Sequence, residues 1–115
     1  MKKTAFIIFS LFAITGCSSL NDVREKTPVG TFSTKKNLDK VSECVLFGWQ
    51  NQKYMIGGSI PTFIQPLLNG KTVYTEDNTY VADFISSDNK LTEIKFYSQA
   101  PYLRDRMRDV IKSCI

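Results

Sequence analysis

The sequence contains no histidine among its 115 residues. Histidine is the commonest general base near neutral pH and the commonest metal ligand, so its absence removes the usual route to acid–base catalysis and to a zinc site. No Gly-x-Ser-x-Gly nucleophile motif occurs either. The carboxylates show no calcium-loop spacing, so we expect neither a metal nor another cofactor.

The chain also lacks a strong excess of charge of either sign. It has 15 basic and 11 acidic residues, a net charge of +4. Two of the basic residues, Lys2 and Lys3, belong to a predicted leader, and their removal leaves 13 basic against 11 acidic residues. A surplus this small does not favour nucleic acid as a partner.

The apolar stretch from Thr4 to Gly16 is shorter than a membrane span, which takes about 20 residues. It follows Lys2 and Lys3 and ends in small residues. A basic start, a short apolar run and small residues before a cleavage site are the pattern of a signal peptide. We therefore predict that residues 1–16 form a cleaved leader.

The segment Ile14-Thr15-Gly16-Cys17 resembles the lipobox of bacterial lipoproteins. The resemblance implies cleavage after Gly16, attachment of diacylglycerol to Cys17 and N-acylation of the new terminus with a further fatty acid such as palmitate. Ser18 follows the cysteine, which in a Gram-negative cell implies sorting to the outer membrane, with the protein on its periplasmic face. The alternative is an ordinary signal peptide whose cleavage site contains a cysteine.

Beyond the leader, the sequence predicts a tether and one domain. Residues 17–33 comprise the lipidated cysteine and a stretch rich in Ser, Asn, Thr, Pro and Gly with no apolar period, which is typical of a flexible linker. Val29 and Phe32 are apolar enough to dock on the domain. Residues 34–115 are predicted to form a single domain, because a chain of this length is too short for two.

The domain is predicted to have an α+β fold. A helix from residue 35 to 47, capped by Ser33 or Thr34 and ended by Gly48, presents Leu38, Val41 and Val45 on one face. Short connections then predict an antiparallel sheet of about four strands, with Asn69-Gly70 as a type I′ turn. The strands are expected at residues 60–65, 71–75, 79–85 and 91–97. A closing helix from residue 101 to 113 carries an apolar seam of Leu103, Met107, Val110 and Cys114, and both helices are expected to cover one face of the sheet.

Three cysteines are present, and one of them is assigned to lipid. The other two, Cys44 and Cys114, border the apolar faces of the two helices. In an oxidising periplasm they can form a disulfide bond. The alternative is a pair of free buried thiols that act as small apolar residues.

The candidate partner contacts are of two kinds. Trp49 and Tyr54 lie in the stretch around Gly57-Gly58, where they are either core aromatics or contacts on a protruding loop. The closing helix carries Arg104, Arg108 and Lys112 at helical spacing, either as a basic stripe for an anionic partner or as a solvated face paired with Asp105 and Asp109. Asp83 alternates with Val81 and Ile85, and its carboxylate is either a functional acid or a partly exposed group.

These features predict a non-enzymatic protein. We expect a lipid-anchored outer-membrane lipoprotein that binds an envelope protein or serves as an envelope accessory module. The order of its elements is similar to that of small envelope lipoproteins of proteobacteria. One alternative is a periplasmic inhibitor or immunity protein that inserts residues 49–58 into a lysozyme-like or toxin enzyme. A peptidoglycan-active enzyme is the third hypothesis.

Overall fold

The computed structural model describes residues 19–115. The predicted leader, residues 1–16, and the predicted lipidation site, Cys17, lie outside the described residues. No helix among residues 19–115 has the length and apolar character required to cross a membrane.

The described residues form three α-helices and one antiparallel sheet, which confirms the α+β class. The elements are, in chain order, α1 (Leu20–Arg24), β1 (Gly30–Thr34), α2 (Leu38–Gln50), β2 (Thr62–Leu67), β3 (Gly70–Thr75), the 3-10 turn η1 (Glu76–Asn78), β4 (Tyr80–Ser86), β5 (Thr92–Ser98) and α3 (Arg104–Cys114). The strand order is β1-β5-β4-β3-β2. The sheet therefore has five strands where about four were predicted, because residues 30–34 pair with β5.

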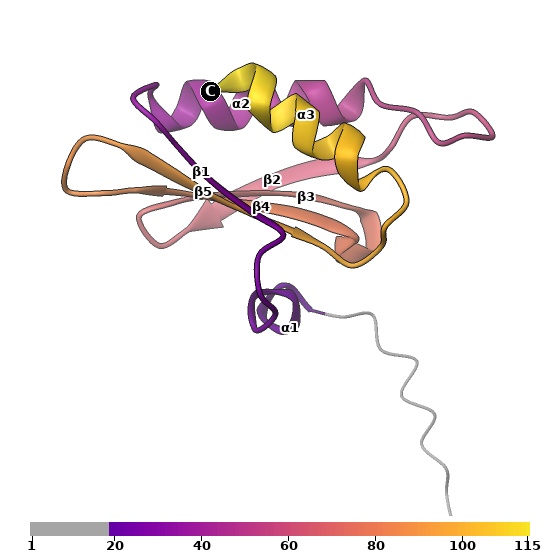
Figure 1. Cartoon of the computed structure of the whole chain (residues 1–115), viewed down its shortest axis with the longest axis horizontal. Coiled ribbons are helices and arrows are strands. Elements are labelled where there is room, and N and C mark those ends of the chain that lie inside the picture. The colour runs from indigo at the N-terminus through magenta and orange to yellow at the C-terminus, as the bar shows by residue number, and fades with distance from the viewer. Residues whose placement is uncertain (1–18) are drawn as a thin grey trace, which may run out of the picture.

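The helices lie in two layers on opposite faces of the sheet. Figure 1 shows α2 and α3 side by side over one face and α1 below the other. The main core lies under α2 and α3, and alternate residues of the central strands point into it: Tyr80, Ala82, Phe84, Ile94 and Phe96. This placement of α2 and α3 on one sheet face is the predicted one.

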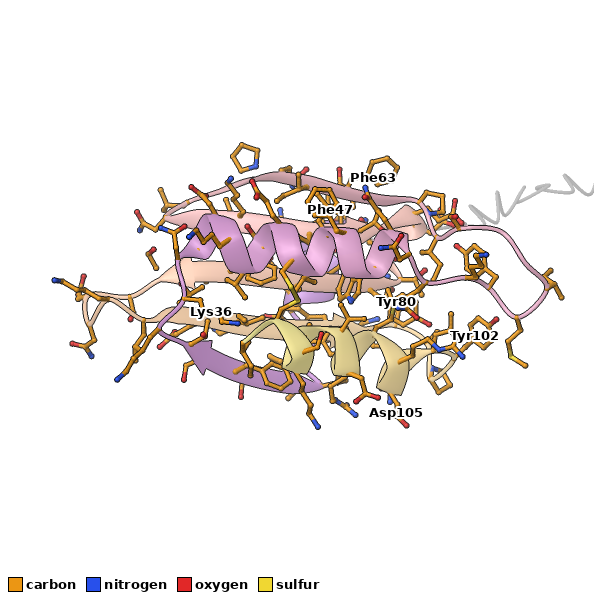
Figure 2. The ribbon with its side chains drawn as sticks, turned by 90° about the horizontal axis from the view of Figure 1, so that it is seen from above. Lys36, Phe47, Phe63, Tyr80, Tyr102 and Asp105 are labelled. Atoms are coloured by element: carbon orange, nitrogen blue, oxygen red, sulfur yellow. A yellow bond between two sulfur atoms is a disulfide. The ribbon has the colours of Figure 1, made fainter. Side chains whose placement is uncertain are left out.

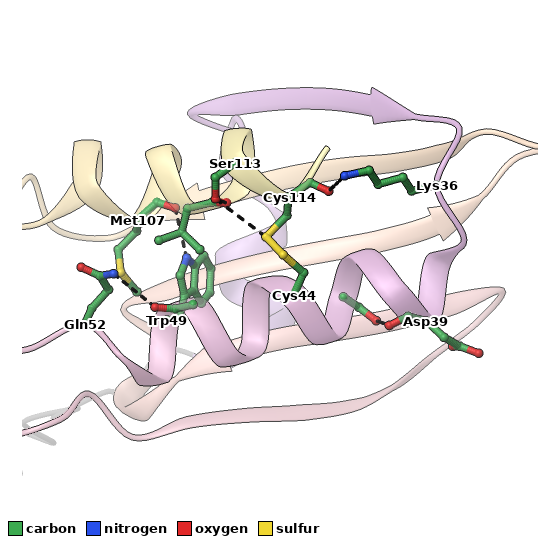
Figure 3. The surroundings of a disulfide bond; sticks show 11 residues. Lys36, Asp39, Cys44, Trp49, Gln52, Met107, Ser113 and Cys114 are labelled. Atoms are coloured by element: carbon green, nitrogen blue, oxygen red, sulfur yellow. Dashed lines mark hydrogen bonds between the residues drawn. A yellow bond between two sulfur atoms is a disulfide. The ribbon is translucent and has the colours of Figure 1, made fainter.

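A disulfide bond joins the two helices of the main layer. Cys44 on α2 and Cys114 at the end of α3 are bonded, with their Cα atoms 5.9 Å apart, as predicted from the sequence. Near the end of α2, the Trp49 indole N–H donates a hydrogen bond to the carbonyl of Met107 near the start of α3, 3.0 Å away (Figure 3). The helix pair is thus held by the covalent bond where α3 ends and by a buried hydrogen bond where α2 ends.

Gly48 was predicted to end the first helix, but α2 continues to Gln50. A Cβ atom at Gly48 would lie 2.4 Å from a methyl carbon of Val110 on α3. The glycine therefore allows α2 and α3 to approach closely, and it does not act as a stop signal. Val110 consequently packs between the helices while Ile111, outside the predicted seam, is fully buried.

The start of each main helix also differs from the prediction. Asn37 caps α2, and its side-chain oxygen accepts hydrogen bonds from the backbone of Asp39 and Lys40. The predicted caps, Ser33 and Thr34, belong instead to β1. At the other helix, Leu103 has a φ of 59°, a left-handed conformation that separates the turn after Pro101 from α3.

The turn between β2 and β3 forms where it was predicted but has a different construction. Leu67 pairs with Gly70, so Leu68 and Asn69 are the two loop residues. Asn69 supplies the left-handed conformation, with a φ of 59°. Gly70 is required for another reason, because a Cβ atom there would lie 1.8 Å from the carbonyl oxygen of Phe84 on β4.

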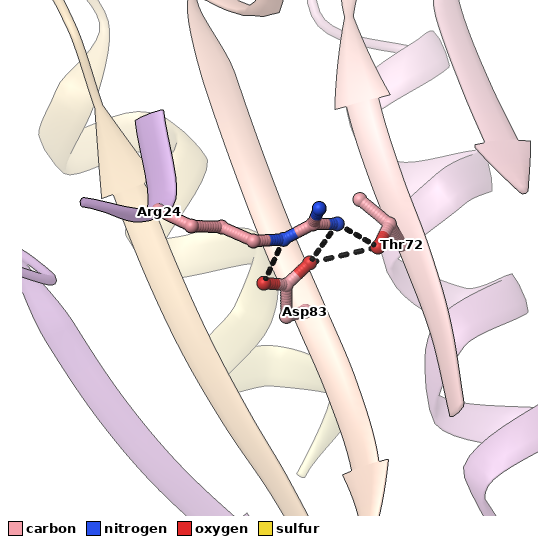
Figure 4. Close-up of polar contacts among 3 residues, drawn as sticks. All are labelled: Arg24, Thr72 and Asp83. Carbon is pink, nitrogen blue, oxygen red and sulfur yellow. Dashed lines mark hydrogen bonds and ion pairs between the residues drawn. The ribbon is translucent and has the colours of Figure 1, made fainter. Parts of the chain in front are cut away.

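The predicted tether is largely folded. Helix α1 packs on the second face of the sheet, where Val23 is 1% exposed and forms a small core with Val81 and Tyr97. The Arg24 guanidinium donates to both carboxylate oxygens of Asp83, at 2.8 and 3.1 Å, as Figure 4 shows. The flexible-linker prediction failed because these partners are about 60 residues away and leave no local period.

We predict that the disulfide contributes a large share of the stability. Replacing Cys44 and Cys114 together by alanine is expected to lower the free energy of unfolding by about 4 kcal/mol, because the bond closes a long loop in the unfolded chain. Urea denaturation followed by the fluorescence of Trp49 measures this difference, with the reduced wild-type protein as a control. Equal midpoints for the oxidised wild type and the double variant would contradict the prediction.

Candidate functional site

The most prominent surface feature is the loop between α2 and β2, residues 51–59, which we call the 51–59 loop. It projects from one end of the molecule beyond the helices and the sheet (Figure 1). Its tip carries two apolar side chains: Met55 is 78% exposed and Ile56 is 99% exposed. Two adjacent exposed apolar side chains on a protruding loop form a small apolar patch, which is a candidate contact for a partner.

The 51–59 loop has an ordered backbone. Lys53 and Ser59 form an isolated antiparallel bridge. The Tyr54 N–H donates to the Gly58 carbonyl at 3.1 Å, and the Gly57 N–H donates back to the Tyr54 carbonyl at 2.9 Å. The turn is made possible by two glycines with φ values of 89° and 91°. Such angles strain residues with a side chain, so the Gly57-Gly58 pair sets the shape of the tip.

Three side chains brace the 51–59 loop against the rest of the domain. The Tyr54 hydroxyl donates a short hydrogen bond to the Glu76 carboxylate. The hydroxyl of Tyr102, which precedes α3, accepts a hydrogen bond from the Met55 N–H at 2.7 Å. The Arg106 guanidinium donates to the Lys53 carbonyl at 3.5 Å. These contacts come from two different segments, so the tip is held from both sides.

The base of the 51–59 loop is anchored in the core. Trp49 at its start and Ile60 at its end are both fully buried, and the Ile60 N–H donates to the Gln52 carbonyl. Trp49 therefore offers no surface to a partner, and the core interpretation of this residue is correct. A rigid base and a braced tip together present Met55 and Ile56 in one fixed arrangement.

The hydrogen bond to Glu76 has a strong electrostatic effect on Tyr54. It raises the pKa of Tyr54 from 10 to about 12, with smaller contributions from burial and from the negative charge of Glu76. The hydroxyl keeps its proton because ionisation would place two negative charges side by side. Tyr54 thus acts as a neutral donor that holds the loop.

Two buried polar atoms near the base of this loop have no hydrogen-bond partner among the described residues. They are the hydroxyl of Tyr80 and the Nε atom of Arg104. Burial raises the pKa of Tyr80, the neighbouring Tyr102 raises it further, and the positive charge of Arg104 opposes both effects. Tyr80 and Tyr102 lie at the same end of the molecule (Figure 2). The Tyr80 hydroxyl and the Arg104 Nε atom are therefore still able to form hydrogen bonds that the described residues do not supply.

The predicted basic stripe on α3 is not a uniform surface. Arg108 donates to the Asp105 carboxylate at 3.0 Å and to the Val29 carbonyl at 3.2 Å. Its guanidinium therefore joins α3 to the residue that directly precedes β1. Arg104 is partly buried, and Lys112 is exposed near the far end of the helix. Of the candidate contacts, Tyr54 lies in the loop and Arg104 lies near its base.

Asp83 is buried in the sheet and forms an ion pair with α1. Its side chain is 4% exposed and is paired with Arg24, while the Thr72 hydroxyl donates to it at 2.7 Å. The hydrogen bond to Asp83 raises the pKa of Arg24 above its usual value. Asp83 thus holds α1 on the sheet, and this role explains the carboxylate without invoking catalysis.

An open cleft of about 810 Å³ lies at the opposite end of the domain, around the N-terminus of α2 and the two hairpin turns. Lysines predominate among its charged lining residues, but two are engaged: Lys71 pairs with Asp39 at 2.9 Å, and Lys36 donates to the Cys114 carbonyl. The Asn37 side-chain oxygen already accepts hydrogen bonds from the backbone amides of Asp39 and Lys40 at the start of α2. Within residues 19–115, no three His, Cys, Asp or Glu side chains converge on a possible metal position.

Comparison with family models, with curated proteins and with solved structures finds no significant match to this chain. The 51–59 loop is therefore the feature of the described residues from which we infer a function. Two of its important residues, Met55 and Ile56, were not singled out from the sequence. The available signal was an apolar pair directly before Gly57-Gly58, a dipeptide that marks a turn or loop.

We predict that Tyr54 ionises with a pKa of about 12 in the folded protein. Because this value lies above the ordinary 10, the interaction stabilises the fold fully below pH 10, and its contribution is lost between pH 10 and 12. The difference in near-ultraviolet absorbance between wild type and Tyr54→Phe during an alkaline titration isolates this residue. Glu76→Gln is expected to lower the Tyr54 pKa toward 10, whereas Asp77→Asn changes it less. An unchanged Tyr54 pKa in Glu76→Gln would disprove the assignment.

Proposed function

We propose that this chain is a bacterial lipoprotein that binds a protein partner at the cell envelope and has no enzymatic activity of its own. The anchor is the lipid on Cys17, which becomes the N-terminus after cleavage behind Gly16. The domain lies on the periplasmic face of the outer membrane. The segment Ile14-Thr15-Gly16-Cys17 supports the anchor, and Ser18 supports the choice of membrane.

The observation that carries the binding function is the exposed apolar tip of the 51–59 loop. Met55 and Ile56 are 78% and 99% exposed on a loop that Tyr54, Tyr102 and Arg106 hold in place. Burying one such side chain in an interface stabilises a complex by roughly 1.5–3 kcal/mol. A preformed loop also avoids most of the entropy cost of ordering on binding.

The disulfide supports an extracytoplasmic location. Disulfide bonds persist in oxidising compartments such as the periplasm and are rare in the cytosol. The bond between Cys44 and Cys114 uses both cysteines of the domain. The third cysteine, Cys17, is the one assigned to lipid, so no thiol is left over.

Inhibition of an enzyme is a second candidate function, favoured by the shape of the loop. A braced loop with an apolar tip can enter the active-site cleft of a lysozyme-like or toxin enzyme, as inhibitors with preorganised loops do. Crosslinking in cells followed by identification of the partner separates the two functions. A hydrolase indicates inhibition, and an assembly or transport protein indicates an accessory role.

We predict that the wild-type protein incorporates a fatty-acid analogue during growth and that Cys17→Ala does not. The physical reason is that the thioether and amide positions for the acyl chains are both on Cys17. Metabolic labelling followed by gel analysis measures the incorporation, and Cys44→Ala serves as the control cysteine variant. An unlabelled wild type, or a labelled Cys17→Ala variant, would refute the anchor.

We predict that Ile56→Asp abolishes most partner binding without affecting the fold. Placing a charge at the tip replaces a favourable apolar contact with an unfavourable desolvation, which weakens binding by roughly 10- to 100-fold. The melting temperature should stay unchanged because the side chain is 99% exposed. The readout is the yield of the crosslinked partner in cells.

The matched control for Ile56→Asp is Leu68→Asp. Leu68 is 86% exposed and lies in the turn between β2 and β3, at the other end of the sheet. It should retain the wild-type yield of crosslinked partner. If Ile56→Asp binds as well as the wild type, or Leu68→Asp loses binding to the same degree, the 51–59 loop is not the contact surface.

A further inference from the structure

The distance between the proposed anchor and the folded domain is short. Ser19 is the N-cap of α1, with its side chain accepting a hydrogen bond from the Asp22 N–H. Cys17 precedes Ser19 by two residues, and two fully extended residues span at most about 7 Å. If Cys17 carries the lipid, which rests on the function proposed above, α1 begins within this distance of the headgroups.

Helix α1 cannot move away from the sheet at low cost. Val23 is buried against Val81 and Tyr97, and Arg24 neutralises the buried Asp83 through two hydrogen bonds. Lifting α1 would leave the Asp83 carboxylate, 4% exposed, without its counter-charge. Removing one member of a buried ion pair is strongly destabilising. The position of α1 therefore fixes which side of the domain is nearest to the anchor.

We infer that the sheet face carrying α1 lies against the lipid headgroups. We call this surface the α1 face. It consists of α1 and the strand residues whose side chains point to the same side, which follow from the register of the strands: Thr31, Ser33, Phe63, Gln65, Leu67, Thr72, Tyr74, Val81, Asp83, Ile85, Glu93, Lys95 and Tyr97. Helices α2 and α3 cover the opposite face of the sheet (Figure 1).

The side chains of the α1 face suit a lipid surface. Phe63 on β2 and Tyr74 on β3 are paired across the two strands, and their rings lie 5.5 Å apart. Phe63 is 48% exposed. Amphipathic aromatic rings are favoured at the level of lipid headgroups, where one end is apolar and the other is hydrated.

Electrostatic attraction to anionic lipid is not the cause of the contact. The unpaired ionisable groups of the α1 face and of the turn after α1 are Asp22, Glu25, Lys26, Glu93 and Lys95, which carry opposite signs in nearly equal number. The short link to the anchor and the aromatic pair of Phe63 and Tyr74 therefore position the domain. The contact should then change little with salt concentration, unlike the binding of a basic surface.

This orientation leaves the 51–59 loop accessible from the periplasm. The loop projects from the end of the domain, at the level of α2 (Figure 1). A protein partner can reach Met55 and Ile56 without displacing lipid. The membrane and the partner thus use different surfaces of the same small domain.

The test compares two labelled sites on the full lipidated protein. Lys95→Cys on the α1 face and Lys112→Cys on α3 each replace an exposed lysine, and the Cys44–Cys114 bond leaves the new thiol as the only free one. Each variant, carrying a fluorophore on the new thiol, is inserted into vesicles of phosphatidylethanolamine and phosphatidylglycerol with a quencher on some headgroups. We expect quenching at position 95 to be several-fold stronger than at position 112, with little dependence on salt.

A linker variant provides the matched control. About ten Gly and Ser residues inserted between Ser18 and Ser19 add a flexible span of roughly 17 Å, which should bring the quenching at the two positions close together. Equal quenching at both positions in the native-length protein, or stronger quenching at position 112, overturns the orientation. A label at position 95 that is shielded only at high protein concentration also overturns it, because it indicates that a second copy covers this face.

The same experiment distinguishes failure of the orientation from failure of the anchor. Protein that floats with the vesicles but shows no difference between the sites has the anchor and lacks the orientation. Wild-type protein that does not float, or a Cys17→Ala variant that floats equally well, refutes the anchor itself. The melting temperatures of both labelled variants should match the wild type, because both lysines are exposed.

Discussion

Strand β4 is buried on both of its faces, and the arrangement of the other elements follows from this requirement. Tyr80, Ala82 and Phe84 enter the main core, while Val81 and Asp83 point to the opposite side and are buried as well. A sheet in a chain of this size normally keeps one face in water. Here α2 and α3 cover the first face, and the short helix α1 covers the centre of the second. Asp83 ties α1 to the sheet, because a buried carboxylate needs a counter-charge and the Arg24 guanidinium supplies it.

The two ends of the helix layer have different functions. The disulfide ties the middle of α2 to the end of α3, and the hydrogen bond from Trp49 to Met107 ties them where α2 ends. The second contact holds the base from which the 51–59 loop projects. A small domain with limited core benefits from a covalent staple at one end, since the other end can then present an exposed apolar loop without loss of stability.

The proposed anchor and the proposed binding loop are mechanically connected through the sheet. The hydrogen bonds from Arg24 to Asp83 join α1, the first helix after the proposed anchor, to the central strand. The 51–59 loop is joined to the same core through Trp49 and Ile60. With the proposed anchor at Cys17, these connections would give the 51–59 loop a defined orientation, which a flexible linker would not.

Local patterns in the sequence were sufficient for several features. The alternation of Thr92, Ile94 and Phe96 placed β5 correctly, helical spacing placed Val41 and Val45 in the core, and composition suggested the pairing of Cys44 with Cys114. These features depend on neighbours within a few residues, or on counting. The need for glycine at positions 48 and 70, by contrast, is decided by Val110 and Phe84, which leave no space for a Cβ atom there in the folded chain.

The same distinction applies to the candidate site. The sequence placed Tyr54 near a protruding glycine turn, because Gly-Gly pairs favour turns wherever they occur. It could not place Trp49 in the core or α1 on the sheet, because the Met107 carbonyl and the Asp83 carboxylate lie about 60 residues away along the chain. The exposure of Met55 and Ile56 was likewise decided by tertiary structure, since the braces from Glu76, Tyr102 and Arg106 converge on the loop only when the sheet and α3 are assembled.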